Sequence, residues 1–123
     1  MGSNPSWRIS ILETKDPYGW HTIDMKTFEY IQERLKNFES MTWSDILLDG
    51  KKQNHSVAVD RLCKQAKDRL EELRLFSVEK LVSLRLSSRG RIWGIPDPKE
   101  KAVLKLLWWD PRHEICPSLK KYT

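Results

Sequence analysis

Hydrophobic and polar positions follow two different periods in the N-terminal part of the chain. Residues 6–12 (SWRISIL) alternate apolar and polar side chains, which predicts a β-strand. Residues 23–40 instead place apolar side chains at spacings of three and four, which predicts an amphipathic helix. Asp24 stands at the expected N-cap, where its carboxylate can accept a hydrogen bond from a free first-turn amide.

Two further helical segments are predicted before the period changes. Thr42 is followed three residues later by Asp45, an approximate capping box that predicts a short helix within residues 41–52. Residues 57–75 carry an apolar stripe at helical spacing, and their outer face balances acidic and basic side chains. We expect residues 57–75 to form a scaffold helix and the polar residues 51–56 before it to form a loop.

From residue 79 onward the pattern alternates with a period of two. Residues 79–87, 91–95 and 102–109 predict three successive strands, and residues 115–117 are a candidate for a last edge strand. The last of the three predicted strands is apolar enough to be central in a sheet.

This order of elements predicts an α+β fold. We expect one domain over residues 1–123, in which the N-terminal strand and two to three helices pack on one face of a mostly antiparallel sheet of three to five strands. Residues 1–6 are expected to be disordered or to derive from cloning.

The chain carries a formal net charge of +5, and the whole excess lies in its C-terminal part. Residues 1–80 hold 13 basic and 13 acidic side chains, whereas residues 81–123 hold 9 basic and 4 acidic ones. A basic half beside a neutral half is typical of proteins that bind an anionic partner, most often a nucleic acid. A chance imbalance on an ordinary surface explains the charge equally well, so charge alone leaves both interpretations open.

Composition and spacing argue against several classes of protein. No apolar run approaches the roughly 18 residues of a membrane span, and the N-terminus lacks a signal peptide, so we expect a cytoplasmic protein. Cys63 and Cys116 are expected to be reduced thiols, with a disulfide left open. The three histidines His21, His55 and His113 lack a second ligand at a typical metal spacing, apart from Cys116 three residues after His113, and there is no glycine-rich phosphate loop. We therefore expect neither a metal nor a cofactor.

The remaining chemistry lies in the basic strands. Arg85 lies on the opposite face of its strand from the apolar residues, Arg91 opens the next strand, and His113 follows the last one. Arginine binds phosphate oxygens through its planar fork, and histidine transfers protons near neutral pH. Because RNA supplies its own nucleophile, the 2′-hydroxyl, these groups suit metal-independent cleavage of RNA.

Two sets of functional residues follow from this interpretation. The predicted catalytic residues are Arg85, Arg91, His113 and Tyr122. The predicted nucleic-acid-binding residues are Arg89, Lys105, Arg112, Lys120 and Lys121, of which Lys121 also assists catalysis. Structural interpretations compete with these roles, because tryptophans on strands are more often packed in a core and arginines and histidines near turns are more often solvated.

The stretch SLRLSSRGRIWGI, followed by a proline-marked turn and VLKLLWWDPRHE, resembles the RelE/ParE-like superfamily of bacterial toxins. It is similar to that superfamily's run of a strand with Leu-Arg, a strand that opens with arginine, a hydrophobic strand and a basic or histidine-bearing turn. The resemblance covers residues 58–123 and, more weakly, the first strand. The pattern RIWG…LLWWDPxH is also similar to a group of small bacterial proteins of uncharacterised function.

The resemblance implies a RelE-like fold and a metal-independent endoribonuclease that cleaves mRNA with or without the ribosome. It implies RNA or the ribosome as target and a cognate antitoxin as partner. Arg85 and Arg91 would hold the phosphate, His113 would transfer a proton, and Tyr122 would stand for a C-terminal aromatic. The chain departs from the superfamily in its DPRHE turn and in the inserted residues 41–56, and ParE-like members inhibit gyrase instead.

Two other functions stay open. A non-catalytic module that binds nucleic acid or protein, such as a phage or host defence accessory or a toxin-like inhibitor of a nucleic-acid enzyme, would lose activity with total charge rather than with one residue. A protein-interaction domain would use its tryptophans as contacts, since Trp and Arg dominate binding hot spots. For the endoribonuclease, Arg91→Ala is expected to abolish cleavage and to leave stability nearly unchanged.

Overall fold

The computed structural model describes residues 2–49 and 53–117, which form an α+β fold around one mixed sheet. The strands are β1 (Ser6–Arg8), β2 (His55–Ala58), β3 (Lys80–Arg85), β4 (Arg91–Pro96) and β5 (Val103–Asp110). Their spatial order is β1-β5-β4-β3-β2. β1 runs parallel to β5, and the other neighbours are antiparallel, which confirms the prediction of a mostly antiparallel sheet with β5 inside it.

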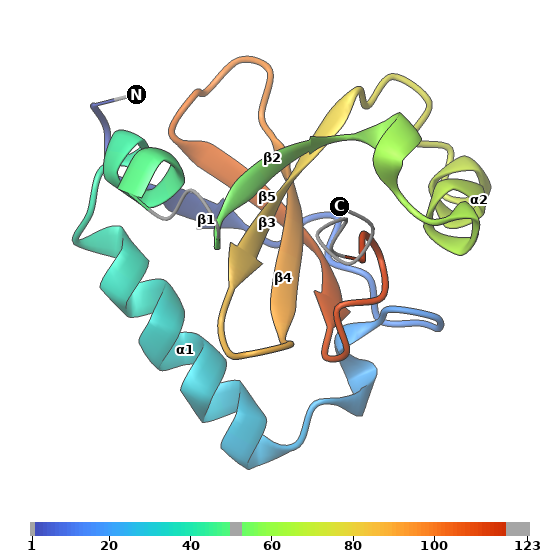
Figure 1. Ribbon diagram of the computed structural model, residues 1–123, viewed down its shortest axis with the longest axis horizontal. Coiled ribbons are helices and arrows are strands. Elements are labelled where there is room, and N and C mark those ends of the chain that lie inside the picture. The colour runs from blue at the N-terminus through green and yellow to red at the C-terminus, as the bar shows by residue number, and fades with distance from the viewer. Residues whose placement is uncertain (1, 50–52, 118–123) are drawn as a thin grey trace.

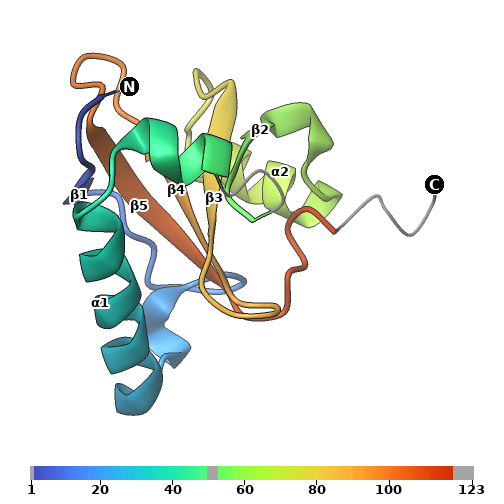
Figure 2. The same ribbon diagram turned by 60° about the vertical axis from the view of Figure 1, so that its left-hand side comes forward.

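Helices cover both faces of the sheet, which corrects the prediction that they all pack on one face. α1 (Met25–Glu39) lies against one face and α2 (Lys64–Glu72) against the other, as Figures 1 and 2 show from two sides. We call these the α1 face and the α2 face. The physical reason is that β3, β4 and β5 carry large buried apolar side chains on both sides, so each side needs its own cover.

Each face has its own hydrophobic core. On the α1 face, Ile31 and Phe38 of the helix pack with the strand residues Val82, Leu84, Ile92, Leu104, Leu106 and Trp109. On the α2 face, Ala66 and Leu70 of the helix pack with the strand residues Leu81, Trp93, Ile95, Leu107 and Trp108. The three strand tryptophans are therefore buried, as the core interpretation of these residues expects.

The segment before α2 departs from the helix predicted over residues 57–75. Residues of β2 pair with β3 at the edge of the sheet, and α2 begins only after them. Val57 packs against the α2-face core, and the Val59 N–H still donates to the Glu79 carbonyl at 2.9 Å. The β-branched Val57 and Val59 fit a period of two as well as a helical stripe, which is why the helical pattern concealed the strand.

Local capping signals are confirmed. Asp24 Oδ1 accepts a hydrogen bond from the Thr27 N–H at 2.8 Å and caps α1. Thr42 Oγ1 accepts from the Asp45 N–H at 3.1 Å, and Asp45 Oδ2 accepts from the Thr42 N–H at 3.4 Å. This box opens a short helical segment, Asp45–Asp49, which is wound as a π-helix. Within the described residues, no helix combines the length and apolar character needed to cross a membrane.

Smaller predictions at the ends of the chain are corrected. β1 is shorter than the predicted strand. The prediction of an edge strand at residues 115–117 is wrong, because Ile115 is buried in the α2-face core and pairs with no strand. Within residues 1–6, the Ser3 carbonyl accepts a hydrogen bond from the Trp43 N–H at 2.9 Å.

β5 carries one extra residue opposite β4. The pairing shifts between Trp93 and Gly94, which leaves Leu107 as the extra residue of β5. The two strands approach closely here, because a Cβ on Gly94 would lie 2.9 Å from the Lys105 carbonyl oxygen. Glycine is therefore required at this position.

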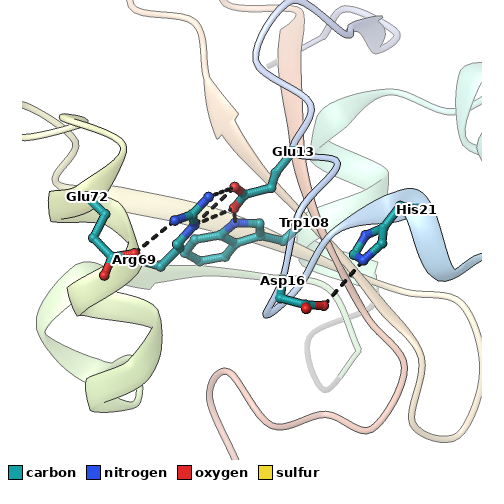
Figure 3. Close-up of polar contacts among 6 residues, drawn as sticks. All are labelled: Glu13, Asp16, His21, Arg69, Glu72 and Trp108. Carbon is teal, nitrogen blue, oxygen red and sulfur yellow. Dashed lines mark hydrogen bonds and ion pairs between the residues drawn. The ribbon is translucent and has the colours of Figure 1, made fainter.

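A buried ion pair fastens α2 to the sheet and to the segment after β1 (Figure 3). Glu13 is 6% exposed and accepts hydrogen bonds from the Arg69 guanidinium of α2 and from Trp108 Nε1 at 2.8 Å. Arg69 Nη1 also reaches the exposed Glu72 at 2.8 Å. The hydrogen bonds to these two carboxylates hold the pKa of Arg69 above its usual range. One carboxylate thus joins three parts of the chain.

Glu13→Ala should lower the free energy of unfolding by about 3–5 kcal/mol, because Arg69 and Trp108 then lose their buried acceptor. The matched control, Glu72→Ala, removes the exposed partner of the same arginine and should cost less than about 1 kcal/mol. Urea unfolding followed by tryptophan fluorescence measures both losses. Equal losses in the two variants would contradict a structural role for the buried pair.

Candidate functional site

Charged side chains form a row on the α2 face where three strands end. Arg85 closes β3, Arg91 opens β4 directly opposite it, and Asp110 closes β5 opposite Arg91. Residues directly opposite one another project from the same face of a sheet. Figure 1 shows this end of β3 and β4 at the bottom of the view, away from α2 at the upper right. The prediction that Arg85 faces away from the neighbouring apolar residues is confirmed, although helix α2 covers another part of the same face.

A second row lies two residues further along the strands on the same face. His55 of β2 is opposite Ser83, Ser83 is opposite Trp93, and Trp93 is opposite Trp108. The two tryptophans and Ser83 are buried, whereas His55 is exposed at the edge of the sheet. The second row therefore places an accessible imidazole beside the row of charges.

Asp110 positions the turn that follows β5. Its carboxylate is fully buried and accepts hydrogen bonds from Trp93 Nε1 at 3.2 Å, from the Glu114 N–H at 2.9 Å and from the Ile115 N–H at 3.1 Å. In this turn His113 takes the left-handed backbone conformation, with φ of 58°. Such a conformation costs a non-glycine residue about 1 kcal/mol or more, and it is common at functional sites.

The half-buried imidazole of His113 interacts electrostatically with the row of charges. Burial lowers the pKa of His113 below its usual value, and the positive charge of Arg91 lowers it next, followed by smaller effects of Arg85 and His55. The charge of Asp110 opposes this lowering. The structure thus gathers the three predicted catalytic residues that it describes into one cluster. The neutral imidazole that results can accept a proton at neutral pH.

Arg91 supports the backbone as well as carrying a charge. It is 7% exposed, and its Nη1 donates to the carbonyls of Ser87 and Gly90, each at 3.2 Å. Burial lowers the pKa of Arg91, and the charge of Arg85 lowers it further. Because Arg91 contacts the β3–β4 turn, we expect Arg91→Ala to lower stability, in place of the nearly unchanged stability expected from the sequence.

Arg85 is held by one hydrogen bond from its backbone and one from its side chain. Its N–H donates to the buried Asn54 Oδ1 at 2.9 Å, and its Nε donates to the Ser87 carbonyl at 3.0 Å. Neither Arg85 nor Arg91 forms an ion pair with a carboxylate of the described residues. Like charges directly opposite one another on neighbouring strands destabilise a sheet, so the arginine pair carries an energetic cost that an anion would offset.

The other predicted binding residues lie at different distances from this cluster. Arg89 is exposed in the β3–β4 turn, and Arg112 is exposed beside His113. Lys105 lies five residues before Asp110 on β5, roughly 16 Å along the strand, so the structure does not bring it into the cluster. Outside the described residues lie Lys120, Lys121 and Tyr122.

Three residues of this site carry no functional signal in the sequence. Asn54 and His55 fall in a segment predicted as a loop, and only the register of β2 reveals where they lie. Asp110 looks like an ordinary turn residue after a strand. Among the described residues no group of three His, Cys, Asp or Glu side chains is arranged to hold a metal, and Cys63 and Cys116 are free.

The pH dependence of stability should report on His113. Because its pKa is lower in the folded protein than the unfolded value of about 6.5, stability should fall as pH drops through and below that value. His113→Asn tolerates the left-handed conformation and should remove this contribution. Urea unfolding of both proteins between about pH 5 and about pH 8 measures the difference. A stability difference that does not change with pH would contradict the buried, neutral imidazole.

Arg91→Ala should lower the free energy of unfolding by about 1–3 kcal/mol, because it removes the buried guanidinium and the hydrogen bonds that its Nη1 donates to the carbonyls of Ser87 and Gly90. The control Arg89→Ala removes an exposed arginine from the same turn and should change stability by no more than about 0.5 kcal/mol. Thermal and urea unfolding compare the two. A neutral Arg91→Ala would mean that the turn does not depend on this side chain.

Comparisons of the chain with protein-family models, with curated proteins and with solved structures gave no match. The relation to the RelE/ParE-like toxins therefore stays a prediction that rests on the quoted residues. Function has to be argued from the site itself.

Proposed function

We propose that this protein is a metal-independent endoribonuclease and that the cluster of Arg85, Arg91 and His113 cleaves RNA. The observation that carries the proposal is the arginine pair, which stands directly opposite across β3 and β4 without a carboxylate partner among the described residues. A phosphate between the two guanidinium groups would relieve their repulsion. Arginine also matches phosphate geometry better than any other side chain.

The two guanidinium groups keep N–H donors available for a ligand. Arg91 uses Nη1 and Arg85 uses Nε to hold the β3–β4 turn. Their other N–H groups have no acceptor among the described residues, and none of those groups is both buried and unpaired. These donors are fixed before a ligand arrives, so they can stabilise the extra negative charge of a pentavalent phosphate without reorganisation.

His113 suits the first proton transfer. Its neutral form accepts the proton of the ribose 2′-hydroxyl, and the 2′-oxygen then attacks the neighbouring phosphorus. Asp110 fixes the backbone that follows His113 and therefore the point from which the imidazole extends. DNA lacks the 2′-hydroxyl, so this chemistry is confined to RNA.

The proposal also includes what the sequence resemblance implies: a RelE-like form of the fold, an mRNA target with or without the ribosome, a cytoplasmic location and a cognate antitoxin. An apolar groove of about 730 Å³ beside α1 supports the idea of a protein partner. At this groove Ile9 is 70% exposed and Met25 is 68% exposed, and exposed apolar patches are typical of interaction surfaces.

The test is cleavage of end-labelled RNA and of translating ribosomes in the presence of EDTA, with the new ends mapped by primer extension. His113→Asn should slow cleavage on the order of 10²–10⁴-fold, because it removes the base. Arg85→Gln should slow cleavage by a similar factor through loss of phosphate stabilisation, on the order of 10²–10³-fold. The matched control, Arg89→Gln, removes one exposed charge nearby and should change the rate only a few-fold, about the effect of one screened surface charge.

A 2′-deoxy substitution at the mapped site should stop cleavage altogether. If RNA binds with a steep salt dependence but stays intact, the endoribonuclease is excluded and the non-catalytic binding module takes its place. Equal losses of activity in Arg85→Gln and Arg89→Gln would show that total charge matters, rather than the arginine pair.

A further inference from the structure

His55 lies on the same surface as the arginine pair, although it is distant from both arginines in sequence. It begins β2 and stands opposite Ser83, and Arg85 follows two residues later on β3. Alternate residues of a strand share a face, so His55 and Arg85 are diagonal neighbours on the α2 face. Diagonal neighbours in an antiparallel pair lie about 7–8 Å apart. The exposed imidazole of His55 is thus within reach of a group bound by Arg85.

Asn54 fixes this arrangement. It is 7% exposed, its Oδ1 accepts from the Arg85 N–H at 2.9 Å, and its Nδ2 donates to the Ile46 carbonyl at 3.2 Å. The side chain of the residue next to His55 is therefore bound directly to the backbone N–H of Arg85. The start of β2 cannot move away from the end of β3 without breaking a buried hydrogen bond.

His55 and His113 belong to segments that flank the β3–β4 pair in the strand order. In the strand order, β2 borders β3 on one side, whereas His113 follows β5 on the other side of β4. The two imidazoles are within electrostatic reach of each other, since the charge of His55 contributes to the lowered pKa of His113. A phosphate held by Arg85 and Arg91 would therefore have one imidazole on each side.

We propose that His55 is the general acid of this site and donates a proton to the leaving oxygen of the RNA. The inference rests on the proposed endoribonuclease function and adds a second catalytic residue to it. Cleavage of RNA needs a base for the 2′-hydroxyl and an acid for the departing 5′-oxygen, and the two groups must lie on opposite sides of the phosphorus. His113 is the base in this scheme, and His55 is the group across the arginine pair.

The atoms of this step balance without a further reactant. Neutral His113 takes the proton of the 2′-hydroxyl, and the 2′-oxygen forms a bond to phosphorus. The bond between phosphorus and the 5′-oxygen breaks, and protonated His55 gives its proton to that oxygen. The products are a 2′,3′-cyclic phosphate and a 5′-hydroxyl end. Water later restores the two protonation states.

The test uses an RNA that carries the cleavage site mapped for the wild-type protein, made in two forms. One form has the natural 5′-oxygen at the cut, and the other has a bridging sulfur there, which leaves without protonation. His55→Ala should slow cleavage of the oxygen form on the order of 10²–10⁴-fold and of the sulfur form less than about tenfold. His113→Asn should slow cleavage of both forms. The control His21→Ala changes a histidine that is paired with Asp16 at 3.3 Å, outside the cluster, and should cut both forms at the wild-type rate (Figure 3).

The outcomes separate this inference from the proposed function. If the wild-type protein cuts no RNA, whether free or on the ribosome, both are overturned. If the wild-type protein cuts and His55→Ala cuts the oxygen form equally well, the role of His55 alone is overturned. Equal slowing of the two forms by His55→Ala would also overturn it, because His55 would then bind or position the RNA. His55→Gln, with an unfolding midpoint matched to the wild type, should repeat the pattern of His55→Ala if proton donation is the lost property.

Discussion

The site depends on one buried carboxylate. Asp110 is out of contact with solvent and accepts three hydrogen bonds, one from the Trp93 indole and two from the backbone after β5. Those bonds hold His113 in a left-handed conformation that it would rarely adopt unaided. The charge of Asp110 also opposes the lowering of the pKa of Arg91 and of His113. The same residue therefore fixes the geometry of the cluster and limits the repulsion inside it.

Two polar clusters among the described residues differ in how many of their hydrogen-bonding groups have partners. The Glu13 carboxylate is enclosed by Arg69 and Trp108, so the charges there compensate one another and the cluster holds elements together (Figure 3). At the other cluster, Arg85 and Arg91 oppose each other across two strands and keep donors free. A sheet tolerates such a pair only at some cost in stability. This contrast is the physical reason to propose a functional role for the arginine pair and a structural role for Glu13.

Strand alternation was sufficient to predict which way Arg85 and Arg91 face, and His113 could be grouped with them because it follows the last strand closely. Capping chemistry, as at Asp24, is local and was equally readable. The position of His55 could not be predicted, because it depends on pairing between β2 and β3, which are far apart in the chain. The sequence also did not reveal that helices cover both faces of the sheet, since the unbroken apolar run LLWW in β5 fits burial on either face.

The extra residue in β5 reverses the parity of that strand partway along its length. Before Leu107 the even-numbered side chains point to α1, and after it the odd-numbered Trp109 does, while Trp108 and Asp110 turn to the other side. An uninterrupted ladder would set Trp109 opposite Arg91 and would move the carboxylate one position out of the row. The layout of the cluster thus depends on the strand register: one inserted residue decides that an acid, rather than an indole, stands opposite Arg91 in the ladder.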